Sequence, residues 1–222
     1  MAFKLSLMLI VLLPLAGCRP APASPLAAAA AAGRTDEIVQ LVRTGADVNA
    51  DAAGWTVLVW AAREGRVAAI EELLAAGADV NQLDHRHRWT PLMHAVHTNE
   101  AAAVRVLIAH GADVNARRGA PLLMAAGNGA TEIVRMLLDA GADPAIERPD
   151  GATPLSEAVS GGALSDIDRP LLGECHDDTV AALLDHAPDL HLNRSYRTRV
   201  ALWFAKFNGC ESTLRRLERA QK

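Results

Sequence analysis

The stretch GADVN at residues 45–49 occurs again at 77–81 and at 111–115, and a degenerate copy, GADPA, follows at 141–145. Successive copies begin 32, 34 and 30 residues apart. A period in this range is typical of solenoid proteins, in which each repeat contacts only its neighbours along the stack. The recurring pentapeptide therefore predicts a stack of similar units over most of the 222-residue chain.

A second recurring stretch lies between the GAD copies. It occurs as TVLVWAAREG from Thr56, TPLMHAVHTN from Thr90, APLLMAAGNG from Ala120 and TPLSEAVSGG from Thr153. Related stretches, SPLAAAAAAG from Ser24 and VALWFAKFNG from Val200, extend the pattern in both directions. Each unit is therefore expected to hold two elements, one formed by this stretch and one that ends at GAD.

Both elements have the composition of helices. Thr90 can cap the first helix, and Pro91 suits its first turn because that position needs no N–H donor. The second helix carries an apolar stripe at helical spacing, as in Ile133, Val134, Leu137 and Leu138. Gly141 can end this helix in a left-handed conformation. Since no unit can bury such a stripe alone, stacking must supply the core.

These stretches resemble the ankyrin repeat, whose pattern is TPLHxAAxxG followed by xxxIVxxLLxxGADVN, and the resemblance covers about Ser24 to Leu217. It implies an all-α ankyrin-repeat solenoid of about six helix-turn-helix units, with capping end repeats, in a domain at 26–222. The units are expected at about 24–49, 50–81, 82–115, 116–145, 146–192 and 193–222. The fifth unit contains an insertion, 163–175, that the repeat pattern does not require.

The N-terminus carries a separate signal. An apolar run from Leu5 to Leu15 follows Lys4 and ends in LAGC at Cys18. LAGC resembles the lipobox of bacterial lipoproteins, which implies a signal peptide at 1–17 and a lipidated Cys18. An ordinary signal peptide and an uncleaved membrane anchor are the alternatives, although the run is about half the length of a membrane-spanning helix.

This resemblance also predicts where the protein is located. Residues 18–25 would form a Pro- and Ala-rich tether between the lipid and the solenoid. In lipoproteins, Asp directly after the lipidated Cys tends to retain the protein in the inner membrane. Because Arg19 holds that position here, we expect the protein in the bacterial envelope, at the outer membrane and facing the periplasm.

Composition and motifs exclude several function classes. The net charge is −4 and no basic block is present, which argues against nucleic acid as a partner. No phosphate loop, HExxH, GxSxG or paired-Cys zinc pattern occurs, so we expect no enzyme activity, no cofactor and no metal. Two alternatives stay open. A surface zinc site would use His85, His87, His94 and His97, although His94 is better explained as a core residue. An enzyme would need a polar pocket near 163–174.

Two cysteines remain after Cys18. In the repeat pattern, Cys175 occupies the place of Gly129, and Cys210 directly follows the equivalent Gly209. Both therefore lie at the turn between the helices of adjacent units, in a compartment where disulfides form. The repeat spacing implied by the resemblance is slightly too long for a bridge. Because the insertion can close that gap, we expect a Cys175–Cys210 disulfide, with two separate thiols as the alternative.

The resemblance implies a binding surface on the concave side of the stack, formed by hairpin tips and first helices. The residues that it assigns to this surface are Trp55, Arg63, Glu64, Arg86, His87, Trp89, His97, Arg118 and Asn128. Trp55 and Trp89 occupy matching places in neighbouring units, and an exposed Trp pair with Arg nearby is typical of interface hot spots. The alternative is that each Trp packs on its own hairpin.

The sequence as a whole predicts a monomeric, non-catalytic protein-interaction module, anchored in the envelope, that binds a periplasmic protein through its concave face. An immunity protein that neutralises a periplasm-targeted toxin and a scaffold for an envelope stress-defence enzyme are the alternatives for its role. A spacer without a specific partner is a third possibility of a different class.

Overall fold

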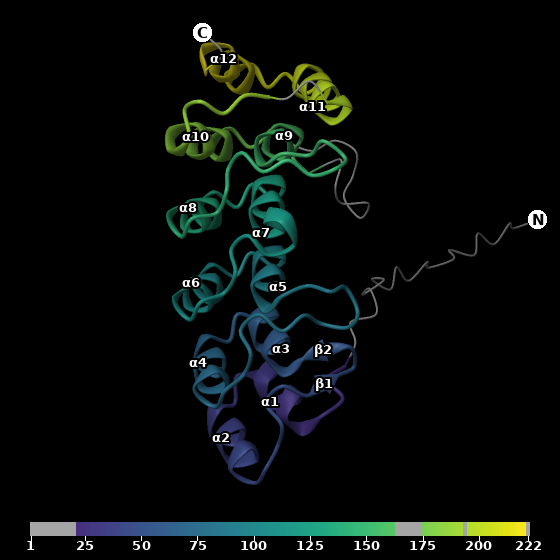
Figure 1. Cartoon of the computed structure of the whole chain (residues 1–222), viewed down its shortest axis with the longest axis vertical. Coiled ribbons are helices and arrows are strands. Elements are labelled where there is room, and N and C mark those ends of the chain that lie inside the picture. The colour runs from purple at the N-terminus through teal and green to yellow at the C-terminus, as the bar shows by residue number, and fades with distance from the viewer. Residues whose placement is uncertain (1–20, 163–174, 193–194, 221–222) are drawn as a thin grey trace, which may run out of the picture.

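The computed structural model describes residues 21–162, 175–192 and 195–220. Within these ranges the chain forms twelve helices and one short hairpin, and the helices stack in pairs along the long axis (Figure 1). The first helices of the pairs are α1 (Pro25–Ala32), α3 (Val57–Arg63), α5 (Pro91–His97), α7 (Ala116–Gly127), α9 (Pro154–Ser160) and α11 (Tyr196–Phe207). The second helices are α2 (Thr35–Arg43), α4 (Val67–Ala75), α6 (Ala101–Ala109), α8 (Thr131–Asp139), α10 (Asp177–His186) and α12 (Glu211–Ala220).

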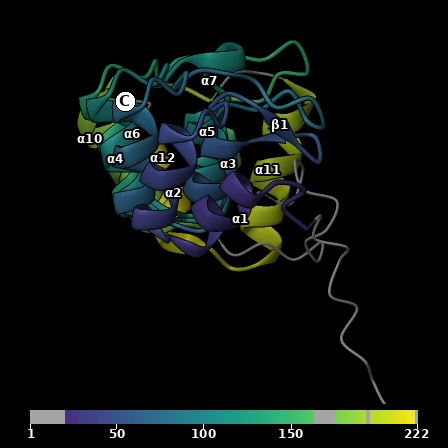
Figure 2. The ribbon, with the colours of Figure 1, turned by 90° about the horizontal axis from the view of Figure 1, so that it is seen from below.

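The stack has two helical layers and a hairpin side. The view along the stack places α2, α4, α6 and α10 on one side and β1 on the other (Figure 2). Strands β1 (Asp51–Ala52) and β2 (Trp55–Thr56) pair antiparallel in the second unit. The predicted all-α solenoid is therefore confirmed, and its first helices lie between the second helices and the hairpin tips.

Side-chain caps start most first helices. The Thr90 hydroxyl accepts a hydrogen bond from the backbone N–H of Met93, and Pro91 follows in the first turn, as the sequence predicts. The same cap is made by Ser24, Thr56, Thr153 and Ser195. Helix α7 lacks it, because Arg117, Arg118 and Gly119 form a left-handed turn in place of a hairpin. The start of five of the six described first helices is thus encoded locally.

The asparagine of GADVN connects each unit to the next. Asn115 donates from Nδ2 to the carbonyl of Gly141 (3.0 Å) and accepts at Oδ1 from the N–H of Asp143 (3.0 Å). Asn49 and Asn81 make the same pair of bonds to the following turn. The fourth copy has Ala145 at this place, so the described ladder stops where the repeat becomes irregular. This explains physically why the pentapeptide recurs.

The core is continuous through the stack. The apolar stripe of α8 (Ile133, Val134, Leu137 and Leu138) is buried, as predicted. Alanine pairs in the first helices are fully buried, for example Ala61 with Ala62 and Ala125 with Ala126. Small side chains let neighbouring first helices approach closely, and α3 therefore contacts both α1 and α5.

The C-terminal units are joined covalently. Cys175, just before α10, and Cys210, just before α12, form a disulfide with a Cα–Cα distance of 6.1 Å, which confirms the predicted pair. Such a bridge stabilises a fold by about 2–4 kcal/mol. Apart from Cys175, the predicted insertion at 163–175 lies outside the described residues, as do the predicted signal peptide at 1–17 and Cys18. None of the described helices is long and apolar enough to span a membrane.

Candidate functional site

An aromatic cluster lies beneath the hairpin tips of the second and third units. Trp55, from β2, packs against Trp60 of α3 with ring centroids 4.6 Å apart. It also lies 5.4 Å from the ring of His94, which α5 contributes from the next unit. The Trp60 indole N–H donates to the carbonyl of Ala52 (3.1 Å), which fixes the hairpin on the helix. The cluster therefore joins two neighbouring units.

The expectation of two exposed tryptophans is wrong for Trp55. Its side chain is only 3% exposed, because Trp60 supports it from its own unit and His94 covers it from the next. Trp89 is half-buried, between His94 (5.2 Å between ring centroids) and His97 (5.3 Å). Packing within the protein, rather than display to a partner, accounts for Trp55.

Asp84 organises the tip above this cluster. Its carboxylate is fully buried and accepts hydrogen bonds from the N–H groups of His87 (2.6 Å) and Trp89 (2.8 Å). It also pairs with Nε2 of His94 at 3.0 Å. Arg88 takes the left-handed conformation (φ 60°), which is more usual for Gly. The prediction that His94 is a core residue is confirmed by its complete burial.

The surroundings of Asp84 and His94 lower the pKa of both side chains. Burial alone would raise the pKa of Asp84, but hydrogen bonds from His94 and from two backbone N–H groups lower it to about 2. Burial lowers the pKa of His94, although the Asp84 carboxylate opposes that shift. Near neutral pH, Asp84 is therefore ionised and His94 is a neutral donor to it.

The structure gathers a different potential metal set from the four histidines that the sequence left open as an alternative. Within the described residues, Asp84, His87 and His94 each offer one ligand atom, and these atoms lie within 4.8 Å of one another. His85 instead contacts Asp51, with Nδ1 2.9 Å from a carboxylate oxygen. An Asp/His/His set can bind zinc. However, both oxygens of Asp84 already accept backbone N–H groups, so this cluster primarily fixes the tip.

A recess opens beside the aromatic cluster, between α1 and α3. Its volume is about 340 Å³, and its lining comprises Pro22, Ala28, Ala31, Ala32, Trp55, Trp60, Arg63 and Glu64. The Arg63 guanidinium lies 5.0 Å from the centroid of the Trp55 ring. Within the part of the chain that the structure describes, the buried indole N–H of Trp55 has no hydrogen-bond acceptor. The recess thus combines an apolar wall with a charged rim.

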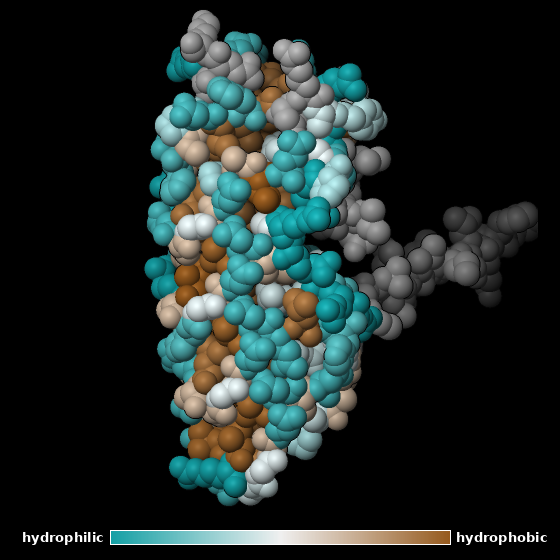
Figure 3. All heavy atoms as spheres, in the orientation of Figure 1, coloured by the Kyte–Doolittle hydropathy of each residue, from teal (hydrophilic) through white to brown (hydrophobic). Residues whose placement is uncertain are grey.

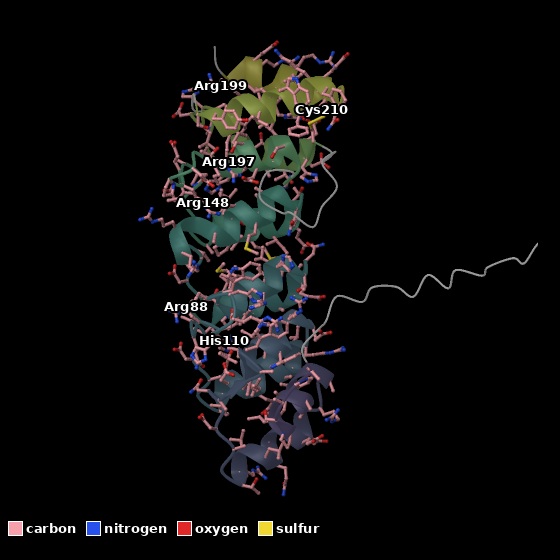
Figure 4. The ribbon with its side chains drawn as sticks, turned by 90° about the vertical axis from the view of Figure 1, so that its right-hand side faces the viewer. Arg88, His110, Arg148, Arg197, Arg199 and Cys210 are labelled. Atoms are coloured by element: carbon pink, nitrogen blue, oxygen red, sulfur yellow. A yellow bond between two sulfur atoms is a disulfide. The ribbon has the colours of Figure 1, made fainter. Side chains whose placement is uncertain are left out.

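Most of the remaining predicted residues form an exposed rim along the tips and beside the aromatic cluster. Arg86, His87 and His97 are exposed near the aromatic cluster, and Arg118 is exposed on the left-handed turn of α7. Asn128 is partly buried at the C-terminal end of α7. Arg88, from the same tip as Arg86, and Arg148, from the tip of the fifth unit, lie along one long edge (Figure 4). Hydrophilic residues cover much of the hairpin side (Figure 3).

A family model of ankyrin repeats (3 copies) matches the chain at residues 7–84, 26–118 and 80–148. Together these matches cover more than half of the sequence. The chain belongs to the ankyrin-repeat family. Ankyrin repeats are generally protein–protein interaction modules and are typically non-catalytic. The comparison with curated proteins gives no significant match. The matches end before α9, so the last two ankyrin helix pairs are the most divergent.

The sequence analysis predicted the burial of His94 but missed that the equivalent residues of two other ankyrin repeats are buried as well. The fifth residue of the first-helix stretch is Trp60, His94 or Glu157 in three units, and each is buried under a tip or a neighbouring helix. Glu157 pairs with Arg197 of α11 at 3.0 Å, and Arg197 also reaches Asp150 at 3.0 Å. The signal was the shared place in the repeat, combined with unusually large or charged side chains.

Proposed function

We propose that this ankyrin-repeat chain is a non-catalytic protein-binding module anchored in the bacterial envelope. It binds a periplasmic protein through the recess between α1 and α3 and the exposed rim beside it. The observation that carries this proposal is the recess of about 340 Å³, whose mainly apolar lining is bordered by the charged side chains of Arg63 and Glu64.

The chemistry of the recess favours a protein as its occupant. The lining alanines and two indoles form an apolar wall that fits an aliphatic or small aromatic side chain. Arg86 and His97 extend the contact outside the recess, where exposed polar groups form the rim of typical interfaces.

Envelope anchoring is the second part of the proposal. LAGC at Cys18 supplies the lipidation signal, and the Cys175–Cys210 disulfide is consistent with an oxidising compartment. Cell fractionation tests it: Cys18→Ser should move the protein from the membrane fraction to a soluble fraction or abolish its maturation. If Cys18→Ser leaves both the mass and the fractionation of the protein unchanged, lipid anchoring is wrong.

The recess is tested by filling it. Ala32, the last residue of α1, is exposed at the recess, so Ala32→Trp should block it without entering the core. Ala109, the last residue of α6, is also exposed but lies on the second-helix layer, so Ala109→Trp is the matched control. We expect one envelope protein to be captured by the wild type and by Ala109→Trp but not by Ala32→Trp.

The results can be interpreted when both variants melt at the temperature of the wild type, because unfolding then cannot explain a loss of capture. Equal capture of that protein by both variants would exclude the recess as the contact site. No reproducible capture from solubilised membranes and periplasm would contradict the binding function itself. The identity of the captured protein then separates a toxin from an envelope enzyme.

A further inference from the structure

Three aromatic side chains are exposed on α11, at the C-terminal end of the stack. Tyr196, Trp203 and Phe207 are 74%, 58% and 64% exposed, and they are the exposed large hydrophobic residues of the described ranges. Their spacing of seven and four residues places them on one face of the helix. Trp203 and Phe207 are stacked, with ring centroids 5.3 Å apart. We call this surface the terminal aromatic face.

Trp203, at the centre of the terminal aromatic face, corresponds to the stacking face of the other units, whereas Phe207 holds the place of Arg63 and His97. Trp203 occupies the place that Val59, Met93, Leu123 and Ser156 hold in the earlier first helices. Those four residues are at most 4% exposed, because the next first helix covers them. The opposite face of α11, with Thr198, Ala201 and Ala205, is buried and packs against α9. Trp203 therefore has the position of a helix-docking residue, but it is exposed, and within the described residues no further first helix stacks on α11 (Figure 1).

The charge around this face is unlike that of the whole protein. Residues 195–220 contain six cationic side chains and two acidic ones, whereas the complete chain has a net charge of −4. The cations are Arg197, Arg199, Lys206, Arg215, Arg216 and Arg219. Arg199 and Lys206 are exposed on α11 itself, and Arg199 lies near the end of the stack (Figure 4). An aromatic surface flanked by Arg is typical of binding hot spots.

We propose that the terminal aromatic face binds an acidic amphipathic helix of a partner protein. The apolar side of that helix would cover Trp203 and Phe207 in the manner of a next first helix. Its acidic side would lie near Arg199 and the cations of α12. A second copy of this chain fits less well, because two identical cationic ends would repel each other at close approach.

A designed peptide tests this proposal directly. The probe is a synthetic helix-forming peptide of about 18 residues, or about five turns, with Leu along one face and Glu along the other. One control peptide has Lys in place of every Glu, and another has the same composition in scrambled order. We expect only the ordered acidic peptide to bind the mature protein, with hydrogen-exchange protection confined to 196–207 and neighbouring α12.

Variants assign the contact to individual side chains. Trp203→Ala should weaken peptide binding by about tenfold or more, as expected for a central aromatic residue. Arg199→Ala should weaken it less and reduce its salt dependence. Arg105→Ala, an exposed change on α6, is the matched control and should have no effect. Because all these side chains are surface residues, melting temperatures should stay close to that of the wild type.

Several outcomes would overturn the proposal. They are no binding of the acidic peptide, equal binding of the Lys or scrambled peptide, or undiminished binding by Trp203→Ala. A dimer in sedimentation that Trp203→Ala abolishes would assign the face to a second copy instead. Tighter binding to vesicles with anionic phospholipid than to the peptide would assign it to a membrane. Ala32→Trp leaves this face intact, so failure at the recess and failure here are distinguishable.

Discussion

Replacing Asp84 by Ala should strongly destabilise the third repeat. The buried carboxylate accepts two backbone N–H groups and pairs with His94, and none of these three contacts can be replaced by a methyl group. Leaving a buried donor without its acceptor costs about 1–3 kcal/mol. Because His87 is exposed and its N–H can turn to water, we expect the three losses together to cost about 3–5 kcal/mol. For a protein of this size, 1 kcal/mol corresponds to about 2–4 °C in melting temperature. Asp84→Ala should therefore lower the melting temperature by about 6–20 °C.

Asp51 provides a matched control. It occupies the hairpin of the preceding unit and is exposed, where it accepts the N–H of Gly54 at 2.8 Å and contacts the exposed His85 at 2.9 Å. Asp51→Ala should therefore cost only about 0.5–1.5 kcal/mol, the usual value of one hydrogen bond. Both variants are compared by thermal and urea unfolding followed by circular dichroism. If Asp84→Ala melts within 2 °C of Asp51→Ala, the carboxylate does not organise the tip, and the reasoning from its three contacts fails.

Further predictions concern pH, the asparagine ladder and the C-terminal units. Because the fold lowers the pKa of His94, the unfolded state binds more protons below about pH 6.5. The free energy of unfolding should therefore decrease as the pH is lowered from 7 to 5. A His94→Gln variant whose free energy of unfolding changes with pH as steeply as that of the wild type would contradict this. Asn115→Ala loses two inter-unit hydrogen bonds and should cost about 1–3 kcal/mol in urea unfolding, whereas Asn128→Ala, at the end of α7, should cost less. Cys210→Ser should lower stability by about 2–4 kcal/mol and speed hydrogen exchange in α11 and α12, and unchanged exchange there would argue against a stabilising bridge. Arg197→Ala leaves the buried carboxylate of Glu157 without this partner and should destabilise more than Arg199→Ala, as differential scanning calorimetry can measure.

The parts of the fold that the sequence predicts are those encoded within a few residues. The Thr90 cap, the left-handed Gly141 and the apolar stripe of α8 depend on neighbours three or four positions away. The disulfide was predictable because the repeat pattern places Cys175 and Cys210 at equivalent turns. Local chemistry and a repeating pattern together determine these features.

The site was predicted less well because burial depends on the next unit. Trp55 has the sequence position of an exposed tip residue, but His94 and the tip that Asp84 fixes cover it from some 30–40 residues away. The pairing of Arg197 with Glu157 spans 40 residues and joins two divergent units. Neither contact follows from the pattern of one repeat. Each requires the relative placement of two units.

The two proposed surfaces lie at opposite ends of the stack, which constrains their partners. Pro22 lines the recess, so the chain enters the solenoid beside that surface. Residues 18–24 can extend at most about 25 Å, at 3.3–3.6 Å per residue. If Cys18 is lipidated, the recess is held close to the membrane. The terminal aromatic face is on α11, five repeat units beyond α1, which is roughly 40–50 Å at the usual interhelical distance. A partner of the recess must therefore reach the membrane surface, whereas a partner of the terminal face can remain well outside it.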